Sequence, residues 1–153
     1  MAKTLAVAKY LNELYKDKYH CDMDQMKMHK MMYFSQREAL MIANNPLFDG
    51  TFEAWKYGPV LCEVRSEYFK TQKFADYYGD LSEDEKRIVN SAFERYASES
   101  AWRLSSLSHE EFSWRQARGG AAYNDPSTNP MSLSAIRVDA KRELLRRKGV
   151  LNV

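Results

Sequence analysis

The 153-residue sequence predicts a mainly helical, all-α fold: a compact bundle of about six helices with one short extended segment or hairpin near residues 51–55. Three observations support this. Glycine and proline are scarce, at 6 and 4 residues, the segments with helical periodicity are long, and one short stretch alternates as a strand does. Hydrophobic residues make up 44% and charged residues 29%, which is typical of one soluble globular domain, here residues 1–153.

Two helices are expected in the first third of the chain. Thr4 can cap the first and Asp24 the second. The second helix should end near Asn44, because the run Asn44-Asn45-Pro46 cannot continue a helix. Apolar residues recur every three or four positions in both helices: Leu5, Ala8, Leu11, Leu14 and Tyr15 in the first, and Met28, Met31, Met32, Ala39 and Ile42 in the second.

The extended segment and a third helix follow. The stretch Phe48–Tyr57 alternates enough to allow one short strand or hairpin. It runs directly into Gly58-Pro59, and proline is favoured at the first position of a helix. We therefore expect a third helix to begin at Gly58-Pro59 and to continue through Tyr68.

The second half of the chain carries the remaining helices. Ser82-Glu83-Asp84-Glu85 fits a capping box and predicts a fourth helix. A fifth is expected from about Glu99 to Leu107, and a short helical turn around Glu110–Arg118. The last helix should follow Pro130, after a turn-rich loop over Gly119–Pro130.

Composition predicts a cytoplasmic protein with no dedicated nucleic-acid surface. The net charge is only +2, and the mean hydropathy is −0.63. No stretch approaches the ~20 apolar residues of a membrane span, and the N-terminus lacks the apolar core of a secretory signal. Two cysteines, Cys21 and Cys62, cannot form a disulfide framework, which favours a reducing compartment.

The residues that could support catalysis are sparse. The three histidines and two cysteines show no metal-ligand spacing, so we expect neither a metal nor a cofactor. The one candidate nucleophile is Cys62, near a helix start that could lower its thiol pKa, with His109 as a possible base. Free cysteines are usually buried, so we expect Cys62 to be packed and the protein not to be an enzyme.

Two features suggest binding. Six basic residues against two acidic ones between Arg137 and Lys148 give the last helix a basic face that could contact phosphates, or that simply suits the negative end of the helix dipole. Methionines crowd the second helix, and aromatic residues crowd Phe48–Tyr57 and flank His109. Such residues usually form cores, but they also make adaptable protein-binding surfaces.

Three motifs resemble one known family. Residues 27–36, KMHKMMYFSQ, are similar to the K-L-x-K-L-L-Y-Y-x-Q opening of the Panacea antitoxin domain, whose members include SocA-like antitoxins and phage-associated Gp-A-like proteins. Residues 52–60, FEAWKYGPV, match its F-x-A-W-x-Y-G-P-V signature closely, and residues 107–114 resemble its L-S-H-x-x-x-x-W element. The central run is specific because it combines rare residue types in fixed order.

The resemblance implies an antitoxin that neutralises a cognate protein toxin by direct binding, or that acts as an adaptor delivering the toxin to a protease. The alternative is a phage or prophage accessory protein that binds nucleic acid or a host protein through the basic last helix. The partner contacts we expect are Met28, Met32, Phe52, Trp55 and Tyr57. The motif residues we expect to be structural, with Trp55 and Tyr57 packed inward, are Lys30, Tyr33, Trp55, Tyr57, Gly58, Pro59, His109 and Trp114.

Overall fold

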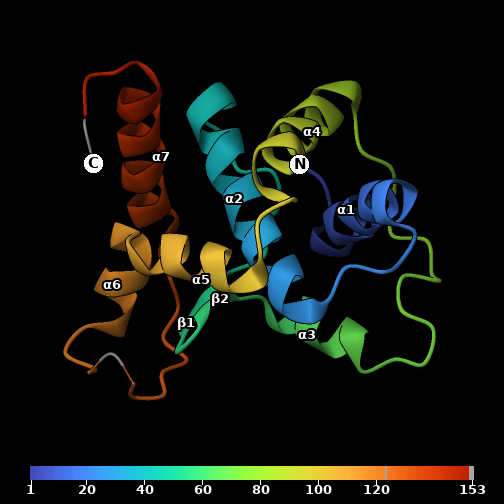
Figure 1. Cartoon of the computed structure of the whole chain (residues 1–153), viewed down its shortest axis with the longest axis horizontal. Coiled ribbons are helices and arrows are strands. Elements are labelled where there is room, and N and C mark those ends of the chain that lie inside the picture. The colour runs from blue at the N-terminus through green and yellow to red at the C-terminus, as the bar shows by residue number, and fades with distance from the viewer. Residues whose placement is uncertain (123, 152–153) are drawn as a thin grey trace.

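The computed structural model describes residues 1–122 and 124–151, and over these residues the chain is mainly helical, as predicted (Figure 1). The described part contains seven helices and one antiparallel two-stranded sheet. In chain order the elements are α1 (Thr4–Tyr19), α2 (Gln25–Ala43), β1 (Glu53–Trp55), β2 (Gly58–Val60), α3 (Cys62–Tyr68), α4 (Glu83–Tyr96), α5 (Ala101–His109), α6 (Phe112–Arg118) and α7 (Leu133–Arg147).

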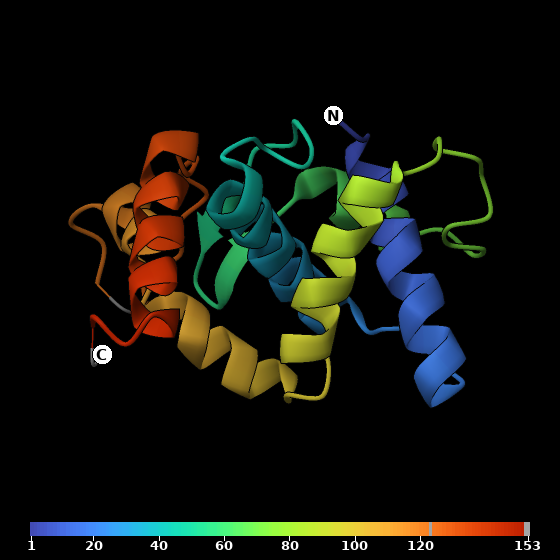
Figure 2. The same ribbon diagram turned by 90° about the horizontal axis from the view of Figure 1, so that it is seen from above.

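Helix α2 lies at the centre of the molecule. Seen from above, α7 lies on one side of α2, and α4 followed by α1 lie on the other (Figure 2). The helices α3 and α5 and the strand β2 also pack against α2. None of the helices in the described residues combines the length and the apolar character needed to cross a bilayer.

The burial of α2 extends around its whole circumference. All fourteen residues from Lys27 to Leu40 are buried, charged ones included. A helix normally keeps a polar face in water, so a helix buried on all sides must find a partner for each polar side chain. Lys27 donates to the carbonyl of Ala97, and the Gln36 side chain bonds the backbone of Leu47 and Phe48.

Most helix boundaries follow the local signals. The Asp24 side chain accepts from the backbone N–H of Lys27, Asn44 ends α2 in a left-handed conformation, and Ser82 forms the complete capping box with Glu85. Thr4 does not cap α1; Lys3 precedes the helix without a side-chain cap. Helices α5 and α6 begin about two residues later than expected, α5 because its cap is Ser100.

The third helix was predicted to start too early. Gly58 and Pro59 belong to β2, which pairs with β1 in the register Glu53–Val60, Ala54–Pro59 and Trp55–Gly58, and α3 begins only at Cys62. The hairpin thus extends beyond residues 51–55. Proline is tolerated in β2 because its partner Ala54 directs its own N–H to the other side of β1, to the carbonyl of Asn129 at 2.8 Å.

A buried polar cluster joins α2 to α6 and α7. The hydroxyl of Tyr33 lies 2.9 Å from Glu111 Oε2 and 3.0 Å from Asp139 Oδ2. Asp139 also accepts the backbone N–H groups of Phe112 and Ser113, and the guanidinium of Arg37 pairs with Glu111. A second link between α2 and α7 is a bidentate ion pair, in which Arg147 donates to both oxygens of the buried carboxylate of Glu38.

The proton balance of this cluster singles out Glu111. A phenol has one proton, so Tyr33 can donate to only one of its two carboxylate neighbours at a time. Burial raises the pKa of Glu111 to about 7, with the charge of Asp139 acting in the same direction and Arg37 opposing. A protonated Glu111 can donate to Tyr33 while Tyr33 donates to Asp139, which satisfies all three groups.

The protonation of Glu111 makes stability depend on pH. Its ordinary pKa is 4.5, so between pH 4.5 and 7 the folded state binds more protons than the unfolded state, and stability falls as pH rises through this window. We expect Glu111→Gln, which keeps a donor toward Tyr33, to remove a fall on the order of 2–3 kcal/mol. Urea unfolding at pH 5, 6, 7 and 8 measures it.

The matched control is Glu110→Gln, which changes an exposed carboxylate beside Arg115 and should leave the pH profile unchanged. The test compares variant with wild type, since buried His29, whose pKa burial lowers to about 3, contributes an opposite slope between pH 3 and 6.5. A wild-type pH profile in Glu111→Gln would show that Glu111 does not hold the proton.

Candidate functional site

The hairpin that carries the central motif is held in place on both edges. On the outer edge of β1, Ala54 bonds Asn129, and Met131 donates to the carbonyl of Phe52 at 2.8 Å. On the side of α5, Ser105 Oγ donates to the carbonyl of Tyr57 at 2.7 Å. In Figure 1 the hairpin lies next to α5 and α6 on one side and leads into α3 on the other.

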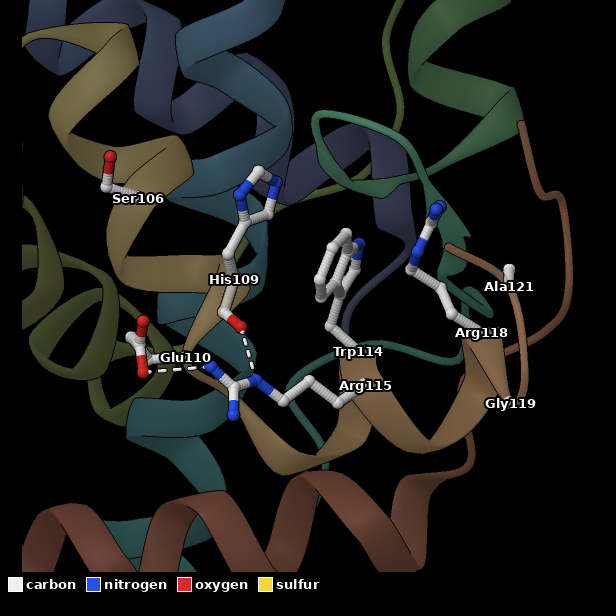
Figure 3. Close-up of a pocket in the computed structure, with 8 residues that line it drawn as sticks. All are labelled: Ser106, His109, Glu110, Trp114, Arg115, Arg118, Gly119 and Ala121. Atoms are coloured by element: carbon white, nitrogen blue, oxygen red, sulfur yellow. Dashed lines mark hydrogen bonds and ion pairs between the residues drawn. The ribbon is translucent and has the colours of Figure 1, made fainter. Parts of the chain in front are cut away.

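Three flat side chains support the hairpin from α5 and α6. The His109 ring stacks on Trp114 with centroids 4.3 Å apart, and the guanidinium of Arg118 lies 4.8 Å from the Trp114 ring. Figure 3 shows this row, with Trp114 between the other two. Trp114 Nε1 donates to the carbonyl of Trp55 at 2.8 Å, and Arg118 bonds the carbonyl of Ala54, so the row fixes β1.

A surface groove of about 410 Å³ lies along this row, lined also by Ser106, Glu110, Arg115, Gly119 and Ala121 (Figure 3). Arg115 crosses it to bond the carbonyl of His109 and the carboxylate of Glu110. Burial lowers the pKa of His109, which favours an uncharged ring in the stack. Trp114 and Arg118 bond the backbone of β1, and His109 stacks on Trp114, so the residues along this groove serve first to support the hairpin.

Lys30 lies beneath the hairpin turn. It is 2% exposed, and its Cε and Nζ atoms closely approach Gly58, as does the hydroxyl of Ser108. Burial lowers the pKa of Lys30 to about 8, with the charge of Asp24 opposing. Within residues 1–122 and 124–151, no carboxylate oxygen lies within 4 Å of the ammonium. The motif therefore keeps a buried cation under its turn.

Above this support, aromatic side chains face solvent. Tyr57 is 50% exposed and meets Trp102 of α5, which is 65% exposed, edge to face at 5.8 Å. Trp55 is half-buried, and the guanidinium of Arg65 lies between its ring and that of Phe69, at 5.4 and 5.0 Å. We call these two groups of side chains together the hairpin face; it consists of Trp55, Tyr57, Arg65, Phe69 and Trp102.

Three side chains expected to contact a partner do not reach the surface. Met28 and Met32 are fully buried and Phe52 is 1% exposed. The prediction for the two methionines was wrong because α2 is covered on every side from Lys27 to Leu40, so Met28, Met31 and Met32 are all buried. Phe52 packs edge to face against Phe48 and Tyr33.

The inward packing expected for Trp55 and Tyr57 is also wrong. Side chains alternate along a strand, and in β1 the inward position is Ala54, with Phe52 inward just before it. Tyr57 lies in the turn and projects outward. Of the other motif residues, Lys30, Tyr33, Gly58, Pro59, His109 and Trp114 are all buried.

Sequence reasoning missed Trp102, Arg65 and Phe69 as site residues. No signal in the sequence marked Trp102 as outward, since it lies three residues before buried Ser105 and so on a neighbouring side of α5. No local signal marks Arg65 or Phe69, whose position depends on how α3 lies against the hairpin.

Cys62 is exposed rather than packed, because α3 begins there and turns it toward Glu53. Its Sγ lies 3.3 Å from Glu53 Oε2, and burial together with this carboxylate raises the pKa of the thiol, which disfavours the reactive thiolate. Among the described residues, no group of three His, Cys, Asp or Glu side chains is arranged to hold a metal.

The basic last helix is partly neutralised within the fold. Arg146 and Arg147 pair with Glu143, and Arg147 also pairs with Glu38. Arg137 bonds Asn44. These contacts direct much of the positive charge of α7 toward the protein, so the helix offers phosphates far less than its sequence suggests.

The turn before Pro59 requires glycine. Gly58 has φ of +121°, and a Cβ there would lie 2.7 Å from Ser108 Oγ and 2.9 Å from Lys30 Cε. We expect Gly58→Ala to lower the free energy of unfolding by about 1–3 kcal/mol, measured by urea denaturation. Gly120→Ala, where a Cβ would meet nothing within 4 Å, should change it by less than about 0.5 kcal/mol. Equal effects of the two changes would contradict this role.

Comparison with known proteins agrees with the motif. The family described as antitoxin SocA-like, Panacea domain, matches residues 28–115, more than half of the chain, from the first turn of α2 into α6. The matched segment contains the hairpin, Lys30, Tyr33 and the residues of the hairpin face. No curated protein and no solved structure matches the chain significantly. The chain belongs to the SocA-like antitoxin family that is defined by the Panacea domain.

Proposed function

We propose that this protein is an antitoxin that neutralises a cognate protein toxin by binding it directly through the hairpin face. The proposal is carried by one observation: the family signature presents exposed aromatic rings on a firmly supported hairpin. Membership of the family supports an antitoxin role with a protein partner in general. The binding surface, the direct mode of neutralisation and a cytoplasmic site of action belong to the proposal.

The geometry of the hairpin face suits protein binding. Large aromatic side chains dominate the energetics of protein interfaces, and a preordered surface loses little entropy on association. Tyr57 and Trp102 are held by backbone bonds from buried Ser105 and by the α5 helix, yet both rings stay in water. The core beneath them is already filled, so their exposure is not explained by the packing of the domain itself.

Growth rescue tests the function. The protein encoded by the adjacent reading frame is induced with and without this chain, and the two are then co-purified. Toxicity that is relieved together with a stable complex would support the proposal. A toxic neighbour that is not neutralised, or is neutralised without a complex, would contradict direct binding.

Trp102→Ala is the sharpest variant. Trp102 is exposed at the first turn of α5, and alanine favours helix, so the fold should remain intact. We expect the affinity for the toxin to fall about tenfold or more while the melting temperature stays unchanged. Calorimetric titration and a thermal melt measure the two effects.

Tyr77→Ala is the matched control, because Tyr77 is 74% exposed but lies between α3 and α4, outside the hairpin face. It should bind the toxin as the wild type does. If both variants bind as tightly as the wild type, the hairpin face is not the contact surface.

A further inference from the structure

We propose that the hairpin face recognises an acidic segment of the partner protein, with the buried Lys30, the half-buried Lys56 and the exposed Arg65 and Arg103 supplying the complementary charge. This inference rests on the proposed function and names the chemistry of the partner. It follows from the cations around the hairpin, none of which forms an ion pair within 4 Å among the residues that the structure describes.

The buried cation is the first argument. Lys30 is 2% exposed beneath Gly58 and has no carboxylate within 4 Å in the part of the chain that the structure describes. Other buried charges of α2 do have partners: Arg37 lies beside the carboxyl groups of both Glu111 and Glu143, and Glu38 pairs with Arg147. The charge of Asp24 acts on Lys30 only from beyond 4 Å, and a buried charge with no carboxylate in contact is costly and projects its field into the nearby surface. A carboxylate docked on the turn would relieve this.

The cations around the aromatic rings are the second argument. Lys56 lies 5.2 Å from the Tyr57 ring, Arg65 stacks between Trp55 and Phe69, and Arg103 adjoins Trp102 in α5. None of the ion pairs among the described residues includes any of these three. The neighbouring carboxylate of Glu53 is engaged by Trp55 and Cys62. The face is thus aromatic, and its three cations outnumber this carboxylate, whose charge the two neutral donors leave in place.

A protein carboxylate fits this face better than nucleic acid does. Single strands bind by stacking bases on free aromatic faces, but here cations lie over the rings of Trp55 and Tyr57, and Tyr57 meets Trp102 edge to face. A guanidinium stacked on a ring keeps its in-plane N–H groups free for a carboxylate. A second copy of this chain is also disfavoured, because a symmetric contact would bring like charges together.

Two double variants with equal charge change test the inference. The first, Lys56→Glu with Arg65→Glu, reverses two charges at the hairpin face. The second, Lys141→Glu with Lys148→Glu, reverses the charges of two exposed cations in α7 and at its C-terminal end. The probe is the protein encoded by the adjacent reading frame, titrated at about 50 and 300 mM NaCl. We expect the face variant to lose about tenfold or more in affinity and to lose most of the salt dependence. The α7 variant should stay within about twofold of the wild type.

The outcomes separate this inference from the proposed function. If the complex forms and the two double variants weaken it equally, the acidic partner is refuted while direct binding stands. If no complex forms, the proposed function fails, and a second probe decides the inference: an acidic peptide of alternating Glu and Leu, about 12 residues long, titrated by NMR.

A saturable shift of the Trp102 indole signal by this peptide, lost in the face variant, would support an acidic ligand. The Trp114 indole, which is bound to Trp55, is the internal reference. No shift at millimolar peptide would overturn the inference. So would tighter binding of a DNA duplex of about 20 base pairs at the same signals, or self-association that the face variant abolishes.

Discussion

The structure depends on the burial of one polar helix. From Lys27 to Leu40, α2 has no face in water, although it carries lysine, histidine, arginine, glutamate and glutamine. Each of these groups loses hydration on folding and needs a partner. The partners come from several distant segments of the chain. Arg37 and Glu38 bring in α6 and α7, Gln36 brings in the segment after α2, and His29 accepts the backbone N–H of Leu61. The arrangement of the helices is therefore largely dictated by what α2 must bond.

The same arrangement of helices holds the hairpin in place. α2 places Lys30 beneath the turn, α5 and α6 supply Ser105 and Trp114 to its backbone, and residues 129–131 close the outer edge of β1. Because the backbone of the hairpin is bonded to the rest of the fold, the hairpin offers mainly its side chains to solvent. The backbone of the motif therefore has a structural role, while its aromatic side chains at Trp55 and Tyr57 contribute to the surface.

Local signals predicted the elements well, because a cap or a stop is decided within a few residues. Asp24, Asn44 and Ser82 each act where the sequence places them. Gly58-Pro59 was predicted to start a helix, because proline is tolerated equally at a helix start and in an edge strand. The strand is favoured by a distant contact, the bond from the Ala54 N–H to the carbonyl of Asn129, which the local sequence does not reveal. The methionines of α2 and the outward turn of Tyr57 were missed for the same reason: burial on all sides and strand register are properties of the assembled chain.

The long reach of the α2 contacts has a consequence for synthesis. Tyr33 and Asp139 are 106 positions apart, and Glu38 and Arg147 are 109 apart. A nascent chain on the ribosome will therefore expose the side of α2 that carries Tyr33 and Glu38 until α7 has emerged, since only then can these residues bond Asp139 and Arg147. Commitment to the native state therefore waits for α7, and chains released before α7 will present this surface to chaperones and proteases.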